Sequence, residues 1–136
     1  MRVVIAGTGR LGVAILEPIL NSPDHEVAGL VLNGRQIHGF ARTRYIWASR
    51  LLPKKESPLP WALKAKIPIL WMDRQDAVEC DQIAALKPDL LITCGFSIIL
   101  KPPTLAIPKI GCVNVHSSLL PKHRGPCPFN HVVLAN

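Results

Sequence analysis

The residues best suited to chemistry in this chain are an amide and an imidazole near its end. Asn114 and His116 lie two positions apart in an apolar stretch, Cys112 to His116, which the pattern predicts as a buried β-strand. Because side chains alternate between the faces of a strand, both are expected on one face. An amide donor can stabilise negative charge on a carbonyl oxygen, and an imidazole can transfer protons near neutral pH. The pair therefore predicts acyl transfer.

The same region offers sulfur and nitrogen atoms, so a zinc site is the first alternative. Structural zinc sites usually contain closely spaced cysteine pairs, and this chain has no Cys-x-x-Cys. Pro126 and Pro128 also interrupt the helix-like spacing of the possible ligands. We therefore predict no metal, and we expect the four cysteines to be free thiols, as is usual in the cytosol. The possible ligands are Cys112, His116, His123, Cys127 and His131.

Strand and helix patterns alternate along the chain, which predicts an α/β fold with a Rossmann-like, doubly wound and mostly parallel sheet. Ligands of such sheets bind at the carboxyl ends of the strands, where Gly95 and His116 both lie. Pro68 near the start of the third strand favours an edge position for that strand. Strands are expected at 2–6, 26–32, 67–71, 89–93 and 112–116, and helices at 10–20, 40–52, 61–66, 76–86 and 126–134.

A Gly-x-Gly-x-x-Gly motif, residues 7–12, follows the first strand and opens the first helix, as in dinucleotide-binding sites. The second strand, however, ends at Asn33 without the acidic residue that binds the ribose of NAD, although Arg35 could accept a 2′-phosphate. Two interpretations stay open. The chain could be a non-catalytic dinucleotide-binding module, or the glycines could only let the first helix pack tightly.

Size and composition indicate one domain of 136 residues, 49% hydrophobic and 18% charged. The longest nearly apolar run, residues 90–100, is too short to span a bilayer, and the N-terminus lacks the pattern of a signal peptide. We expect a cytoplasmic protein without membrane contact.

The net charge of +7 lies entirely between residues 33 and 66, a segment with eight basic residues and a single acidic residue, Glu56. Such a localised charge predicts a polyanionic partner, with Arg35, Arg42 and Arg44 as substrate-binding residues. A solvated basic loop without a partner is the alternative.

Residues 111–125, GCVNVHSSLLPKHRG, resemble the signature of the folate-dependent formyltransferases, an Asn-x-His followed by Ser-Leu-Leu-Pro and a basic residue before Gly. The similarity extends back through Cys94-Gly95-Phe96 to Pro88 and forward through the last helix, over about 50 residues.

This resemblance implies that Asn114 donates to the formyl oxygen of 10-formyltetrahydrofolate and that His116 carries a proton from the attacking amine to N10. The backbone after residue 94 would bond the pterin edge, although core packing could equally explain Ile99 and Leu100. Residues 118–125 would close over the site, with Arg124 contacting substrate or bracing the loop. The implied folate-binding residues are Gly95, Phe96, Ile98, Ile99, Leu100 and Ser118.

Within the family, residues 57–68 are most similar to the branch that formylates methionyl-tRNA, and the basic segment 33–66 suits a tRNA. A sugar-nucleotide N-formyltransferase is the alternative. The resemblance also implies a catalytic Asp beyond Asn136. We therefore expect residues 1–136 to be one catalytic domain that stops before its last strands, with uncertain activity alone. Its fold would be incomplete at the C-terminus, with an uncovered sheet edge open to self-association.

Overall fold

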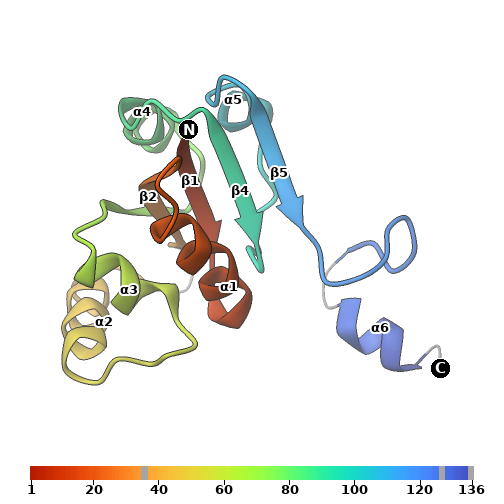
Figure 1. The fold of residues 1–136 in the computed structure, drawn as a ribbon, viewed down its shortest axis with the longest axis horizontal. Coiled ribbons are helices and arrows are strands. Elements are labelled where there is room, and N and C mark those ends of the chain that lie inside the picture. Colours follow the sequence, from red (N-terminus) through yellow and green to blue (C-terminus); the bar gives the residue numbers. More distant parts are fainter. Residues whose placement is uncertain (35–36, 126–127, 135–136) are drawn as a thin grey trace.

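Five parallel strands form one sheet in the computed structural model, which describes residues 1–34, 37–125 and 128–134 (Figure 1). The strand order is β3-β2-β1-β4-β5, and every neighbouring pair is parallel. The expected α/β class and doubly wound sheet are confirmed. The order reverses between β1 and β4, which is where such sheets open a crevice at their carboxyl ends. The strands are β1 Arg2–Gly7, β2 Glu26–Asn33, β3 Ile69–Met72, β4 Leu90–Cys94 and β5 Gly111–Val115.

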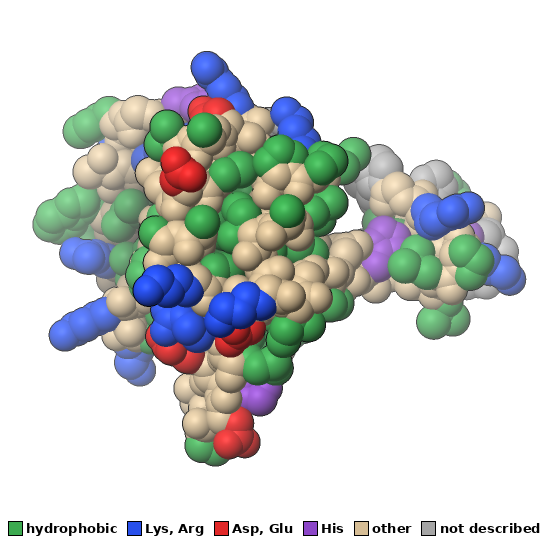
Figure 2. All heavy atoms as spheres, turned by 90° about the horizontal axis from the view of Figure 1, so that it is seen from above, with side chains coloured by type: hydrophobic (Ala, Val, Ile, Leu, Met, Phe, Trp, Pro, Cys, Tyr) green, Lys and Arg blue, Asp and Glu red, His purple; other side chains and the backbone are tan. Residues whose placement is uncertain are grey.

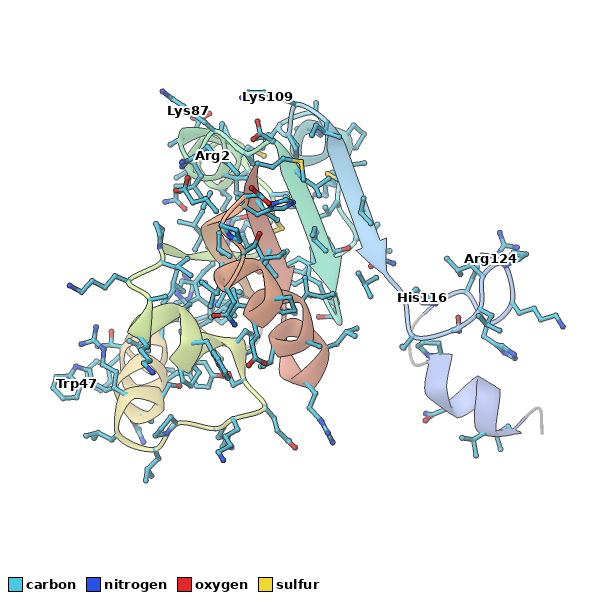
Figure 3. The ribbon with its side chains drawn as sticks, viewed as in Figure 1. Arg2, Trp47, Lys87, Lys109, His116 and Arg124 are labelled. Atoms are coloured by element: carbon cyan, nitrogen blue, oxygen red, sulfur yellow. The ribbon has the colours of Figure 1, made fainter. Side chains whose placement is uncertain are left out.

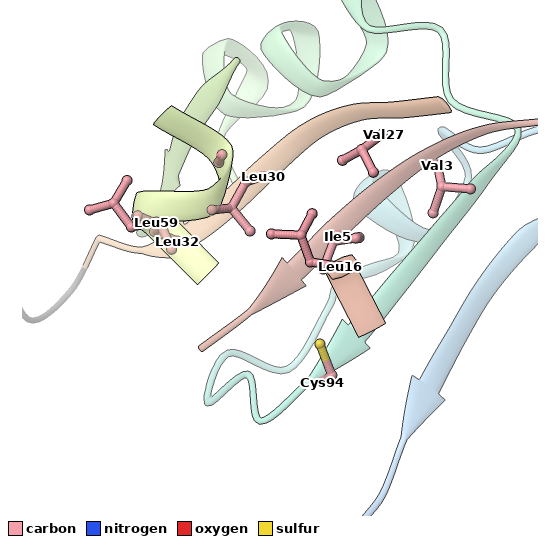
Figure 4. Packing of buried hydrophobic residues seen from close by; sticks show 9 residues of the cluster. Val3, Ile5, Leu16, Val27, Leu30, Leu32, Leu59 and Cys94 are labelled. Atoms are coloured by element: carbon pink, nitrogen blue, oxygen red, sulfur yellow. The ribbon is translucent and has the colours of Figure 1, made fainter. Parts of the chain in front are cut away.

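Two hydrophobic clusters cover the two faces of the sheet. Because side chains alternate along β1, Val3 and Ile5 enter one cluster and Val4 and Ala6 the other. The first cluster packs against α1 (Gly9–Leu20) and α3 (Pro58–Lys64), as Figure 4 shows around Leu16 and Leu59. The second packs against α4 (Ala77–Ala85) through Ile83. The short α5 (Pro102–Leu105) lies beside β4 and β5 (Figure 1).

Helix α2 (Phe40–Leu51) has no buried residue and packs beside α3. The basic helix expected here is present, ending one residue early. Two contacts hold it to β3: the Arg42 guanidinium lies 5.1 Å from the ring centre of Trp71, and Tyr45 meets the same ring edge-on. Ile46 and Ser49 are also half-buried, and the remaining residues of the helix are exposed.

The helix predicted at residues 61–66 begins three residues earlier and ends two residues earlier as α3, with Pro58 at its first position. Ser57 is the N-cap, and its hydroxyl accepts a hydrogen bond from Leu59 N at 3.4 Å. A proline at the first helical position loses no intrahelical bond, because its N–H would be unpaired there anyway.

Glycines of the 7–12 motif permit close packing. A Cβ on Gly7 would lie 2.4 Å from Cys94 Sγ and 2.8 Å from Cys94 O, and one on Gly12 would lie 3.1 Å from Pro58 Cγ. Close packing of β1 against β4 and of α1 against α3 thus accounts for Gly7 and Gly12, whereas Gly9, with a φ of +62° and no atom within 4 Å of a Cβ, provides the turn.

The strand predicted at residues 112–116 is present as β5, but the prediction that it is buried was wrong. β5 is an edge strand that ends at Val115, and it exposes Val113 and Asn114. Beyond it, the chain runs out from the body into α6 (Pro128–Leu134), joined by a narrow neck in two perpendicular views (Figures 1 and 2). Leu119 is 88% and Leu134 85% exposed, so little apolar burial ties this segment to the sheet.

At the opposite end of the sheet, Asp89 joins the starts of three strands. Its carboxylate accepts hydrogen bonds from Arg2 N at 2.7 Å and Lys109 Nζ at 2.9 Å. These bonds, that of Arg2 first, hold the pKa of Asp89 below its ordinary value. Among the helices described, none is long and apolar enough to cross a membrane.

Candidate active site

The carboxyl end of the sheet gathers the polar residues that the sequence singled out. Gly95 follows β4 and His116 follows β5, as expected. Thr8 follows β1 at the point where the strand order reverses, and its hydroxyl donates to Gly95 O at 2.9 Å. The β1 and β4 ends are therefore tied together at the predicted crevice.

Asn114 presents its amide nitrogen as a donor. Thr93 is its register partner on β4, and the Thr93 hydroxyl donates to Asn114 Oδ1 at 2.8 Å. This bond occupies the amide oxygen. No described residue accepts a hydrogen bond from Nδ2, which is the atom that acyl transfer would need. Sequence reasoning missed Thr93, because only the register between β4 and β5 reveals this contact.

His116 is half-buried and lies one residue beyond β5. The alternation of side chains along the strand therefore does not determine which way the His116 side chain points. Its Nε2 is 3.2 Å from His123 O. A carbonyl oxygen only accepts, so Nε2 carries the hydrogen in this contact, and Nδ1 is the basic atom of the neutral ring. His116 thus has one nitrogen held by its own loop and one available for proton transfer.

Residues 95–101 form the loop after β4. Gly95 has a φ of +57°, a left-handed conformation that favours glycine. Phe96 and Leu100 are half-buried against the second cluster, and Ile98 is buried in it. Ile99, by contrast, is 89% exposed. Core packing therefore explains Ile98 and not Ile99.

The residues of this loop fit the folate that the resemblance implies. The backbone N–H and C=O groups of Ile98 and Leu100 have no hydrogen-bond partner within the described chain, while the exposed Ile99 offers apolar surface beside them. Backbone donors and acceptors next to an apolar side chain suit a flat heterocycle with polar edges.

Residues 117–125 do not close over the 95–101 loop. The Ser118 hydroxyl contacts two carbonyls of its own loop, Lys122 O at 3.1 Å and His123 O at 3.2 Å. Figure 3 shows Arg124 at the far side of this projecting segment and His116 at its base. The structure therefore does not bring Ser118 and Arg124 to Gly95–Leu100. A concavity of about 460 Å³ lies within the segment itself, lined by His116, Ser117, Ser118, Leu119, Lys122 and His123.

The predicted substrate-binding arginines differ in their surroundings. Arg42 donates to Ile37 O at 2.8 Å and to Gly34 O at 3.4 Å, so it braces the chain before α2. Arg44 is exposed, and Arg35 lies outside the described residues. Figure 3 places Trp47, on α2, across the molecule from His116.

Cysteines and histidines form no metal centre in the described ranges, where no three His, Cys, Asp or Glu side chains are grouped to hold an ion. Cys127 and the side chain of His131 are outside this description. Cys80, Cys94 and Cys112 are free thiols. Burial raises the pKa of Cys94 to about 11 and also raises that of Cys112, so neither is a ready nucleophile at neutral pH.

Comparison with known proteins extends the similarity to nearly the whole chain. Residues 1–135 match the family model described as Formyl transferase. Methionyl-tRNA formyltransferase of Legionella pneumophila (strain Paris) is 36% identical over 138 residues, covering 98% of this chain and 40% of the relative. The enzyme of the same name from Bacillus licheniformis is 36% identical over 134 residues, covering 98% of this chain and 39% of the relative. The chain thus spans about two fifths of the length of these curated relatives.

Solved structures share the fold at lower identity. Glycinamide ribonucleotide transformylase 1 from Symbiobacterium toebii superimposes with a TM-score of 0.69 at 18% identity, covering 100% of this chain and 60% of that one. Phosphoribosylglycinamide formyltransferase from Brucella melitensis gives a TM-score of 0.64 at 23% identity, covering 98% of this chain and 66% of that one. At these identities the likeness supports the fold alone.

Proposed function

The chain belongs to the formyl transferase family, and we propose that it transfers a formyl group from 10-formyltetrahydrofolate to an amine through Asn114 and His116. In this proposal residues 1–136 act as a catalytic domain in the cytoplasm. The observation that carries the proposal is the Thr93–Asn114 hydrogen bond, which leaves the Asn114 Nδ2 donor available at the carboxyl end of β5.

Formyl transfer would proceed by attack of the amine nitrogen on the formyl carbon. Asn114 Nδ2 would donate to the formyl oxygen as negative charge develops there. His116 would take the proton that the amine loses and deliver it to N10, so that the bond between N10 and the formyl carbon breaks with a neutral leaving group. The folate supplies the formyl carbon, and the protein supplies the donor and the proton path.

Binding of the donor would use residues 95–100 of the loop after β4. The backbone beside Ile98 and Leu100 would pair with the pterin edge, Ile99 and Leu100 would contact its faces, and Gly95 and Phe96 would shape the loop. Ser118 and Arg124, on the projecting segment, would reach the donor or acceptor only if that segment moved toward the sheet.

A fluorescence titration distinguishes this proposal from the dinucleotide-binding alternative. We expect the protein to bind a reduced folate saturably and NADPH or NADH weakly or not at all. β2 ends at Asn33 without the acidic residue that would bind the ribose of NAD, and the Asn33 amide already donates to Ser97 Oγ. Tight NADPH binding without folate binding would overturn the formyltransferase proposal.

For the acceptor, we propose the amino group of methionyl-tRNA. Arg44 and Arg50 on α2, with Lys54 and Lys55 after it, are exposed, and so are Phe40 (78%) and Trp47 (60%). Cations beside exposed aromatic rings suit the phosphates and bases of a nucleic acid. A small sugar nucleotide would not need so wide a surface.

Charge reversal on this surface tests the acceptor. We expect Arg44→Glu with Lys55→Glu to weaken tRNA binding and to reduce the slope of log affinity against log salt by roughly 0.7–0.9 for each phosphate that the protein no longer neutralises. Folate binding should not change. Lys87→Glu is the matched control, because Figure 3 shows Lys87 at the upper edge of the body and Trp47 at its lower left, well apart. Binding that does not depend on salt, or turnover of an amino-sugar nucleotide, would favour the sugar alternative.

A further inference from the structure

A buried glutamine outside the strands holds the loop after β4. Gln75 lies in the turn between β3 and α4, is 6% exposed and has a φ of +59°. Its carboxamide makes three hydrogen bonds to the chain 24 to 29 residues away. Nε2 donates to Ile99 O at 2.8 Å, and Oε1 accepts from Lys101 N at 2.7 Å and from the Thr104 hydroxyl at 3.0 Å.

These bonds have the pattern of a strand partner. In a parallel sheet, a residue donates its N–H to the C=O of one residue on the neighbouring strand, and its C=O accepts from the N–H of the residue two positions further on. The Gln75 carboxamide likewise donates to the C=O of Ile99 and accepts from the N–H of Lys101. The residue between them, Leu100, keeps its own N–H and C=O without a partner in the described part of the chain. Gln75 therefore fixes the backbone on both sides of an unpaired donor and acceptor.

The turn that carries Gln75 is itself held by a carboxylate. Glu79 accepts from the N–H groups of Asp73, Arg74 and Gln75 at 2.9, 3.1 and 2.7 Å. Asp76 caps α4 by accepting from Glu79 N at 3.0 Å. Bonds to a charged acceptor are stronger than neutral ones, so this turn can maintain a left-handed residue and direct its side chain inward.

We infer that Gln75 is a positioning residue of the folate site: it holds Leu100 so that the backbone of this residue can pair with the flat heterocycle of the formyl donor. This inference rests on the proposed function. Gln75 acts through the loop and touches neither donor nor acceptor. Its loss should therefore weaken donor binding while leaving the acceptor surface on α2 and the transfer step itself unchanged.

Two substitutions separate this role from general stability. Gln75→Met keeps a buried side chain of similar length but removes all three hydrogen bonds of the carboxamide. Gln75→Glu keeps an oxygen for Lys101 N and Thr104 but, when ionised, cannot donate to Ile99 O. Lys101→Met is the matched control, because it removes only the exposed bond from Lys101 Nζ to Arg74 O and keeps the backbone bond to Gln75.

We expect both Gln75 variants to bind a reduced folate about tenfold more weakly or worse by equilibrium titration. The KM for the donor should rise by a similar factor with kcat little changed, and amide hydrogen exchange should accelerate at Lys101, whose N–H loses its bond to Gln75 Oε1. Lowering the pH should restore binding to Gln75→Glu, because the protonated carboxyl can donate to Ile99 O, and it should not restore Gln75→Met. Lys101→Met should behave like the wild type.

Wild-type folate affinity in both Gln75 variants would overturn the inference and leave the proposed function intact. If Gln75→Met does not fold, the pH dependence of folate binding by Gln75→Glu alone tests the inference. A folate affinity of Gln75→Glu that does not recover when the pH is lowered would overturn it. If the wild-type protein binds no reduced folate, the proposed function and this inference fail together.

Discussion

Asn114→Ala is expected to slow formyl transfer about 10²–10³-fold, the usual loss when one donor to a developing oxyanion is removed. The effect should appear in single-turnover experiments with 10-formyltetrahydrofolate, while donor affinity stays close to that of the wild type. Folding should change little, because Asn114 is exposed and its side chain makes one described hydrogen bond.

Three further substitutions make this test specific. Asn114→Asp keeps the size but has no N–H donor, so it should be at least as slow as Asn114→Ala. Thr93→Val keeps the donor but frees the amide to rotate, which should cost less, about tenfold. Val113→Ala, at the adjacent exposed position of β5, should turn over normally. Near wild-type rates in Asn114→Ala would remove Asn114 from the mechanism.

The sheet, and the position of Gly95 and His116 at the ends of their strands, could be predicted from sequence, because both depend on local patterns. Apolar runs such as residues 2–6 and 89–93 predicted parallel strands within one or two residues of their observed bounds. The carboxyl-end rule then placed Gly95 and His116 at the same edge. These inferences need only the alternation of side chains and the parallel direction of the strands.

Contacts between distant polar atoms could not be predicted in this way. Thr93 meets Asn114 because of the register between two strands 21 residues apart, and Gln75 reaches Ile99 because a turn adopts a left-handed conformation. Apolar patterns carry no information about either. They also did not predict the exposure of β5, because an edge strand and a central strand can have the same run of apolar residues. Nor could they distinguish Ile98 from Ile99, two identical neighbours of which the first is buried and the second is exposed.

His116 replacement should give the second large effect, a loss of at least about 10²-fold in turnover, because proton transfer from the amine to N10 would lose its carrier. The structure also gives His116 a bracing contact, through Nε2 to His123 O. Loss of rate in His116→Ala alone would therefore not distinguish proton transfer from loop structure.

Glutamine separates these two roles of His116. His116→Gln can still donate an N–H to His123 O, but an amide cannot carry a proton, so this variant should be as slow as His116→Ala. Added imidazole should restore part of the rate to His116→Ala, whose missing ring leaves space, and should do little for His116→Gln. His25→Gln, at an exposed histidine before β2, is the control and should be fully active. If His116→Gln turned over like the wild type, bracing of residues 116–123 would be the whole contribution of His116, and the proton would have to travel by another group.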